Sequence, residues 1–190
     1  MTDVVLFHHA QGRTAGVESF AGRLRAAGHR VTVPDLYDGA TFATLDEGMA
    51  HLRQLGSDTV LDRGRRAVED LPAEVVHAGF SLGVMPAQLL AQTRPGALGA
   101  VLMHACVPPT EFGDGWPPAV PLQIHVMEGD ELGDVDDARA VAADVAAAEL
   151  FLYPGDRHLF TDDSLPAYDA GATDLVVQRV VHFLDAVPHR

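Results

Sequence analysis

Apolar residues recur along the chain in six short runs rich in β-branched side chains, near residues 3–8, 30–34, 74–80, 98–105, 122–128 and 149–153. The stretches between these runs carry apolar residues at the spacing of amphipathic helices. This alternation is typical of βαβ units. The pattern therefore predicts an α/β domain with a mostly parallel sheet and helices on both faces.

Several helix boundaries carry their own signals. Thr14 is a suitable N-cap for the first helix, and Gly28 is a suitable stop. Thr44 and Glu47 have the spacing of a capping box and predict the start of a second helix. The last helix is expected to begin near Thr173. Parallel strands joined by such helices place all their carboxyl ends along one edge, where open α/β sheets bind ligands.

The length of 190 residues suits one domain spanning residues 1–190, with no insertion long enough for a separate cap domain. The formal net charge is −14, and all thirteen cationic residues are arginines. Binding to a phosphate backbone needs clustered cations, so we expect no nucleic-acid partner. The acidity is that of a solvated, soluble surface.

The N-terminal residues lead directly into the first apolar run without a basic region and a long apolar segment, so no secretory signal is expected. No window approaches the ~20 apolar residues of a membrane span, and no membrane partner is expected. The single cysteine, Cys106, cannot form an internal disulfide. These features together predict a cytoplasmic protein.

The pentapeptide Gly79-Phe80-Ser81-Leu82-Gly83 connects an apolar run to a helical stretch. This is the context of a nucleophile elbow, in which a serine is exposed on a strained turn between a strand and a helix. The two glycines allow the strand and the helix to approach without Cβ clashes. Ser81 is therefore the candidate nucleophile.

A serine hydroxyl needs an adjacent base, and the base needs a carboxylate to hold its tautomer. His158 lies in a turn-rich loop after the last apolar run, and Asp130 ends the fifth run. The order Ser81, Asp130, His158 is that of α/β-hydrolases. Asp134 and Asp156 remain alternatives for the acid, although Asp134 also suits a helix N-cap and Asp156 a turn.

A tetrahedral intermediate needs two hydrogen-bond donors for its oxyanion. The amide of Leu82, directly after the nucleophile, is expected to supply one. The other is expected from Ala10, in the loop after the first strand.

Other residues with chemical potential are assigned to the core. Adjacent residues of a strand point in opposite directions, so His8 and His9 are not expected to share a metal, and no metal site is expected. His104 and His125 lie in apolar runs and are expected to form hydrogen bonds near the core. Cys106 lacks a glycine-flanked turn and is expected to pack.

The chain resembles the dienelactone hydrolase family of α/β-hydrolases over nearly its whole length. The resemblance rests on the segments 33–37, the elbow at Ser81, 125–130, 153–155, His158 and Phe160. It implies Ser81, Asp130 and His158 as the triad and Ala10 and Leu82 as the oxyanion donors. It also implies six strands in the order 2-1-3-4-5-6, because the usual antiparallel first edge is missing.

The chain also departs from that family. Ser81 stands where the founding enzymes carry cysteine, His9 where they place a glutamate, and Asp162 where they carry a carboxylate-binding arginine. Asp162 is therefore expected to repel an anionic substrate, with Arg157 as the one nearby alternative cation. The candidate substrate contacts are His9, Gln11, Trp116 and Arg157.

The predicted function is a serine hydrolase that cleaves a small ester or lactone through an acyl-enzyme, without metal or organic cofactor. A thioesterase or acyltransferase could use the same triad. A ligand-binding protein that keeps the fold without catalysis is the alternative from another class. The sequence leaves the physiological substrate and the oligomeric state open.

Overall fold

The computed structural model describes residues 1–188 and contains, within them, one six-stranded sheet in the order β2-β1-β3-β4-β5-β6. The strands are β1 (Asp3–Phe7), β2 (Arg30–Thr32), β3 (Val76–Phe80), β4 (Gly99–Met103), β5 (Leu122–Met127) and β6 (Ala148–Tyr153). Every neighbouring pair is parallel. The predicted strands and their order are therefore confirmed.

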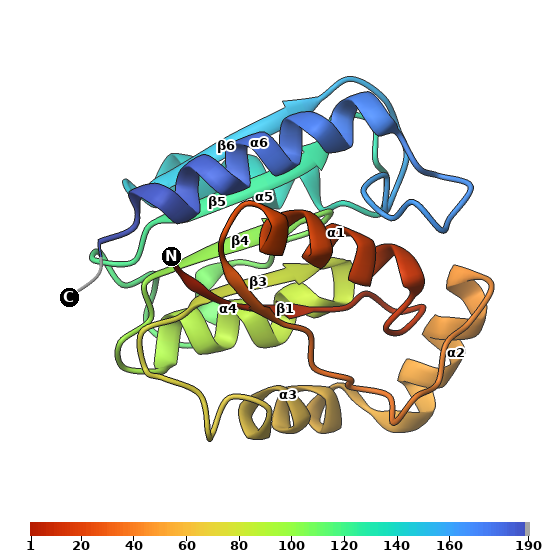
Figure 1. The fold of residues 1–190 in the computed structure, drawn as a ribbon, viewed down its shortest axis with the longest axis horizontal. Coiled ribbons are helices and arrows are strands. Elements are labelled where there is room, and N and C mark those ends of the chain that lie inside the picture. The colour runs from red at the N-terminus through yellow and green to blue at the C-terminus, as the bar shows by residue number, and fades with distance from the viewer. Residues whose placement is uncertain (189–190) are drawn as a thin grey trace.

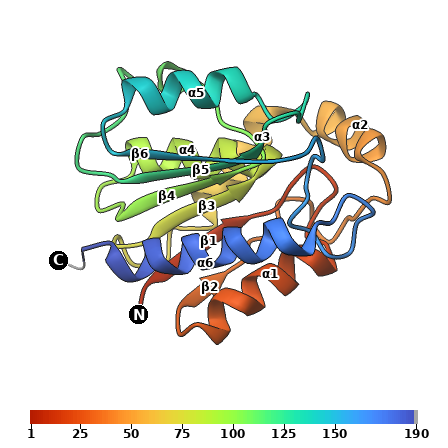
Figure 2. The same cartoon turned by 90° about the horizontal axis from the view of Figure 1, so that it is seen from above.

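Helices cover both faces of this sheet. They are α1 (Ala15–Ala26), α2 (Leu45–Leu55), α3 (Ser57–Arg66), α4 (Val84–Thr93), α5 (Val135–Asp144) and α6 (Ala170–Ala186), with short 3₁₀ turns η1 (Ser81–Gly83) and η2 (Pro109–Glu111). α1 and α6 lie on one face, and α3, α4 and α5 lie on the other (Figure 2). α2 lies beyond the carboxyl ends of the strands (Figure 1).

The predicted capping residues begin their helices. The Thr14 hydroxyl accepts the amide of Val17 at the start of α1. Thr44 and Glu47 form both hydrogen bonds of the capping box before α2. α6 begins earlier than the expected position near Thr173, because the Asp169 carboxylate caps it by accepting the Ala172 amide.

Side chains of one strand alternate between two hydrophobic clusters. Val4 and Leu6 of β1 pack toward α1 and α6, whereas Val5 and Phe7 pack toward α3 and α4. β3, β4 and β5 are buried along their whole length. Strands covered on both faces are largely apolar, which explains why these runs are recognisable in the sequence even though β3 and β5 contain buried polar residues.

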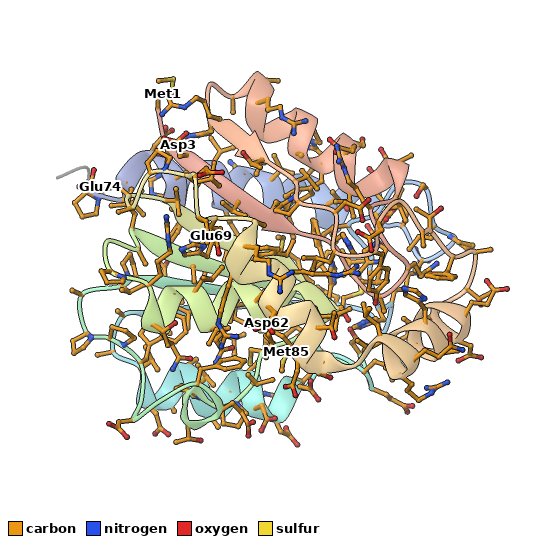
Figure 3. The ribbon with its side chains drawn as sticks, turned by 90° about the horizontal axis from the view of Figure 1, so that it is seen from below. Met1, Asp3, Asp62, Glu69, Glu74 and Met85 are labelled. Carbon is orange, nitrogen blue, oxygen red and sulfur yellow. The ribbon has the colours of Figure 1, made fainter. Side chains whose placement is uncertain are left out.

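Apart from the buried Asp130 and Asp162, the acidic side chains of residues 1–188 are at least partly exposed, as expected from the composition. Asp62 on α3 and Glu69 after it are exposed on the face seen in Figure 3. Among residues 1–188, no helix has the length and apolar character needed to cross a membrane.

The turn from β3 into α4 depends on two close backbone approaches. A Cβ at Gly79 would lie 2.1 Å from the carbonyl oxygen of Gly83, and a Cβ at Gly83 would lie 2.3 Å from that of Phe7. Both distances are far below van der Waals contact. The glycines therefore allow η1 to fold back onto β3 and to lie directly against the end of β1.

We predict that Gly83→Ala lowers the free energy of unfolding by about 1–3 kcal/mol or more, because backbone atoms of β1 must move. Gly22→Ala is the matched control, since a Cβ at this α1 position meets no atom within 4 Å. The control should be neutral or stabilising by up to about 1 kcal/mol. Urea unfolding of the two variants compares them; equal stability would show that the elbow tolerates a side chain at this position.

Candidate active site

Ser81 lies at the carboxyl end of β3, in the sharp turn that opens α4. Its backbone φ is 48°, in the left-handed region that costs energy for a residue with a Cβ. The close approaches at Gly79 and Gly83 hold it in this conformation. The Ser81 side chain consequently stands at the edge of the sheet, half-buried.

His158 reaches Ser81 from the loop that follows β6. Its Nε2 lies 2.8 Å from Ser81 Oγ. The loop is fixed on both sides of the imidazole, because the Arg157 amide donates to the sulfur of Met127 and Leu159 adopts a φ of 60°. The imidazole is therefore presented to the serine by a defined backbone.

Asp130 holds the other side of the imidazole. Its Oδ2 lies 2.7 Å from His158 Nδ1, and its Oδ1 accepts the amide of Leu132. Asp130 as a whole is 4% exposed, whereas the rival residues Asp134 and Asp156 are exposed and form no hydrogen bond with His158. Of the three candidate acids, the structure brings Asp130 to the histidine.

Asp134 differs from the expected N-cap in one respect. It occupies the N-cap position of α5, but its φ is 50° and its side chain makes no capping hydrogen bond. Burial, followed by the negative charges of Asp137 and Asp130, raises the pKa of its carboxyl above the ordinary value. Asp134 therefore occupies the expected N-cap position of α5, but its side chain does not supply the capping hydrogen bond.

The two expected oxyanion donors belong to two different segments, the elbow itself and the loop after β1. Leu82 is in the first turn of η1, where backbone amides have no partner within the helix. Ala10 is in the loop after β1, and its amide donates no hydrogen bond to any atom of residues 1–188. Both amides are consequently available to an oxyanion.

A cavity of about 250 Å³ adjoins His158. Its lining residues are Gln11, Ala43, Thr44, Leu45, His158, Leu159, Leu165, Pro166 and Ala167. Gln11 thus lines this cavity, and its side-chain amide donates to the carbonyls of Phe42 and Ala43. The lining is largely apolar.

The sequence analysis missed the residues that form the walls of this cavity, Leu45 and Leu165 among them. Leu45 begins α2, and Leu165 lies in the loop before α6. For Leu45, the long connection between the second and third strand runs was a usable signal, because it leaves the sheet at the carboxyl edge, where the catalytic candidates lie.

Two expected substrate contacts lie elsewhere. Trp116 packs beside Asp144 and Val145 at the C-terminal end of α5, and its indole donates to the carbonyl of Val120. α5 runs from the carboxyl edge of the sheet to the opposite edge. Trp116 therefore lies at the amino edge of the sheet, away from Ser81 and His158. Arg157 is exposed but donates to the carbonyl of Tyr168, away from the cavity.

His9 and Asp162 are also placed differently from expectation. Both are buried, and His9 Nε2 lies 2.8 Å from Asp162 Oδ2. The carboxylate also accepts the hydroxyl of Thr14 and the amide and hydroxyl of Ser164. Asp162 is absent from the cavity lining, so it does not face a substrate as the sequence comparison implied.

These hydrogen bonds control the ionisation of Asp162. Burial alone would raise its pKa, but the hydrogen bonds from His9, Ser164 and Thr14 outweigh burial and lower the pKa to about 2. An ionised carboxylate in this position is stabilised by every neighbouring donor.

The remaining polar residues near the site are core residues. His125 is hydrogen-bonded to Tyr153 and Gln123, as expected. His104 bonds Thr161 through Nε2 only, and burial lowers its pKa well below the ordinary value. Cys106 is buried, which raises the pKa of its thiol to about 12.

Within residues 1–188, no group of three or more His, Cys, Asp or Glu side chains is arranged to hold a metal.

The model of the dienelactone hydrolase family matches residues 1–187. The chain belongs to this family. No curated protein sequence matches the chain significantly. The sequence-based recognition of the family is thus confirmed, as is the α/β-hydrolase fold.

Solved structures of similar fold span almost the whole of this family member. A dienelactone hydrolase from Anabaena variabilis is 18% identical with a TM-score of 0.70, and the match covers 99% of this chain and 88% of that one. Alpha/beta hydrolase domain-containing protein 10 from mouse is 10% identical with a TM-score of 0.73, covering 98% and 90%. A dienelactone hydrolase-like promiscuous phosphotriesterase from metagenomic libraries is 20% identical with a TM-score of 0.70, covering 98% and 87%. At these identities the matches establish the fold.

We predict that Asp162→Asn destabilises this hydrolase by about 1–3 kcal/mol at pH 7. The NH₂ group of the asparagine can only donate, and it would face neighbouring groups that also donate hydrogen bonds. The native pKa of about 2 lies below the ordinary 3.8, so the stabilisation from ionised Asp162 is full above about pH 4 and disappears as pH falls toward 2. The difference in unfolding free energy between wild type and variant should shrink over that window.

The control for this measurement is Asp163→Asn, an adjacent exposed residue bonded only to Ser19 at the surface. It should change stability by less than about 0.5 kcal/mol. Guanidinium unfolding of the wild type and both variants at pH 7, 4 and 2.5 gives the free energy of unfolding of each protein. If the difference between the wild type and Asp162→Asn stays constant with pH, the ionisation assigned to Asp162 is contradicted.

Proposed function

We propose that the protein is a serine hydrolase that cleaves a small, uncharged ester or lactone through an acyl-enzyme. Ser81 Oγ attacks the carbonyl carbon while its proton passes to His158 Nε2, and Asp130 stabilises the imidazolium. The amides of Ala10 and Leu82 bind the oxyanion. Collapse of the tetrahedral intermediate expels the alcohol, which takes the proton from His158.

The second half of the reaction uses the same groups. His158 takes a proton from water as the water attacks the acyl carbon, and collapse returns that proton to Ser81 as the acid product leaves. A lactone opens in the same way, with the alcohol and acid remaining in one product. The reaction consumes one water for each ester bond, with neither oxidation nor reduction.

One observation carries this proposal: the unbroken chain of hydrogen bonds from Ser81 Oγ through His158 to Asp130, with links of 2.8 Å and 2.7 Å, at a strained turn. Membership of the dienelactone hydrolase family supports the reaction class.

Preference for an uncharged substrate follows from the charges around the cavity. Desolvating an anion requires a paired cation, and no arginine lines the cavity beside His158. Arg157 donates to the Tyr168 carbonyl, and Arg13 is paired with Glu18. Glu131 and Asp134 lie on the other side of Asp130 and add negative charge. The reason for rejecting an anion is therefore this charge distribution, rather than the buried Asp162.

We predict that Ser81→Ala lowers kcat by about 10⁴-fold or more, as deletion of a nucleophile does in other triads. A fluorophosphonate probe should label the wild type covalently and fail to label this variant. Ser19→Ala, at a partly exposed serine of α1 whose hydroxyl donates to Asp163, should keep both turnover and labelling. Turnover of Ser81→Ala within about tenfold of wild type would exclude the serine as nucleophile.

We predict that Asp130→Asn lowers kcat by roughly 10²–10⁴-fold, because the imidazole loses the acceptor that holds its tautomer. Asp134→Asn should change kcat by less than about threefold, since Asp134 makes no hydrogen bond to His158. Steady-state kinetics of both variants tests this ranking, and the reverse ranking would assign the acid role to Asp134.

We predict that kcat/KM for a lactone bearing a carboxylate is at least about tenfold lower than for its methyl ester, a penalty of about 1.4 kcal/mol. Paired assays of the two compounds measure the ratio, and a matched thioester in the same series tests the thioesterase alternative. Preference for the acid would show that an arginine binds the carboxylate, and Arg157→Ala would identify it.

A further inference from the structure

The loop after β1 contains two adjacent, fully buried histidines that the proposed reaction does not use. His8 and His9 are 0% and 1% exposed. Both ring nitrogens of each are hydrogen-bonded, and in each ring one of the two bonds is made to the backbone around Ala10.

The partners fix opposite tautomers in the two rings. The Leu36 amide can only donate, so His8 Nε2 accepts it and His8 Nδ1 carries the proton. His8 Nδ1 therefore donates to the carbonyl oxygen of His9, at 2.8 Å. Burial lowers the pKa of His8 to about 4, so this neutral form is the stable one.

His9 has the other tautomer. Its Nδ1 accepts the amide of Gln11 at 3.2 Å, so the proton is on Nε2 and is donated to Asp162. The Asp162 carboxylate is an acceptor only, and its two oxygens are surrounded by donors from Thr14, Ser164 and His9. The Asp162 carboxylate thus favours the His9 tautomer that carries its proton on Nε2.

The peptide between His9 and Ala10 is held through these contacts. In a trans peptide the C=O and the following N–H point in opposite directions. The His9 carbonyl accepts both His8 Nδ1 and the Gly12 amide, so its direction is fixed from two sides. The Ala10 amide is consequently fixed in the opposite direction, with no protein partner among residues 1–188.

The next peptide is fixed as well. The Gln11 amide is held by His9 Nδ1, and the Gln11 carbonyl accepts the amide of Phe42. The Ala10 carbonyl lies against Gly48 of α2, where a Cβ would approach to 2.2 Å. Ala10 is therefore clamped on both sides by groups that do not themselves reach the cavity.

We propose that His8 and His9 are positioning residues that orient the Ala10 amide as an oxyanion donor, with Asp162 setting the His9 tautomer. This inference rests on the proposed serine hydrolase reaction. A donor aligned before the reaction stabilises the transition state without reorganisation, so its misalignment lowers kcat rather than raising KM.

Paired amide substitutions separate this role from simple packing. An asparagine places its amide near Nδ1, whereas a glutamine extends it to the position of Nε2. His8→Asn and His9→Asn keep the hydrogen bond to the loop around Ala10 and lose the outer bond to Leu36 or Asp162. His8→Gln and His9→Gln do the reverse. Each variant keeps one of two hydrogen bonds, so a structural role alone predicts equal effects within each pair.

We expect the two glutamine variants to lose about 10–100-fold in kcat toward p-nitrophenyl acetate with KM within about threefold of wild type. The asparagine variants should remain within about fivefold in kcat. His182→Asn and His182→Gln, at an exposed position of α6, are the matched controls and should have no effect. Urea unfolding of every variant shows that the kcat differences do not follow stability.

Asp162→Asn gives an independent test that leaves both histidines in place. Its amide donates toward His9 Nε2, which moves the His9 proton to Nδ1 and opposes the Gln11 amide. The expected result is about a tenfold or greater fall in kcat at unchanged KM, so the test stands even where a glutamine variant fails to fold.

Two outcomes overturn the inference. One is an equal fall in kcat in the asparagine and glutamine variants, and the other is a rise in KM with kcat unchanged. Neither affects the proposed reaction as long as the wild type hydrolyses the ester and Ser81 labels with the fluorophosphonate. Absence of wild-type turnover and labelling would instead reject the proposed function itself.

Discussion

The close approach of the elbow to β1 is the constraint on which the rest of the site depends. Because residues 79 and 83 are glycines, β3 can turn directly into η1, and η1 can lie against the carbonyl of Phe7. This contact sets the distance between Ser81 and the loop after β1, where Ala10 lies. The nucleophile and its proposed oxyanion donor are therefore positioned by backbone packing before any side chain contributes.

The other half of the site is positioned by buried polar contacts. Asp130, His9 and Asp162 are each nearly inaccessible to solvent, and each is hydrogen-bonded. Unpaired, such groups would cost several kcal/mol; paired, they link segments that are far apart in the sequence. Asp162 connects the His158 loop to Thr14 at the start of α1 and to His9 after β1.

Most of the fold could be predicted from the sequence because its signals are local. A six-stranded parallel sheet produces continuous apolar runs, and caps such as Thr14 and Thr44 mark helix starts within three residues. Ser81, Asp130 and His158 could be proposed because each lies shortly after the end of a strand, at one edge of the sheet. The placement of a side chain within a long loop has no such signal.

Trp116 and Arg157 illustrate this limit. Trp116 follows a strand at the catalytic edge, but its loop crosses the whole length of the sheet before β5, and the indole packs at the far end. Arg157 is adjacent to His158, yet its guanidinium finds a carbonyl acceptor near α6. The burial of Asp162 depends on donors from two distant residues, His9 and Thr14, which no local pattern of residues indicates.

The strand order also determines when this protein can fold during synthesis. β1 is made first but pairs with β3 across a long separation, as in the register of Val4 with Val76. Until β3 leaves the ribosome, β1 can pair only with the three-residue β2, and a two-stranded sheet of that size is not stable alone. Pairing of β3 with β1 is thus the step that first gives a three-stranded sheet. Ser81 follows β3 directly, so the strained elbow is formed in that same step.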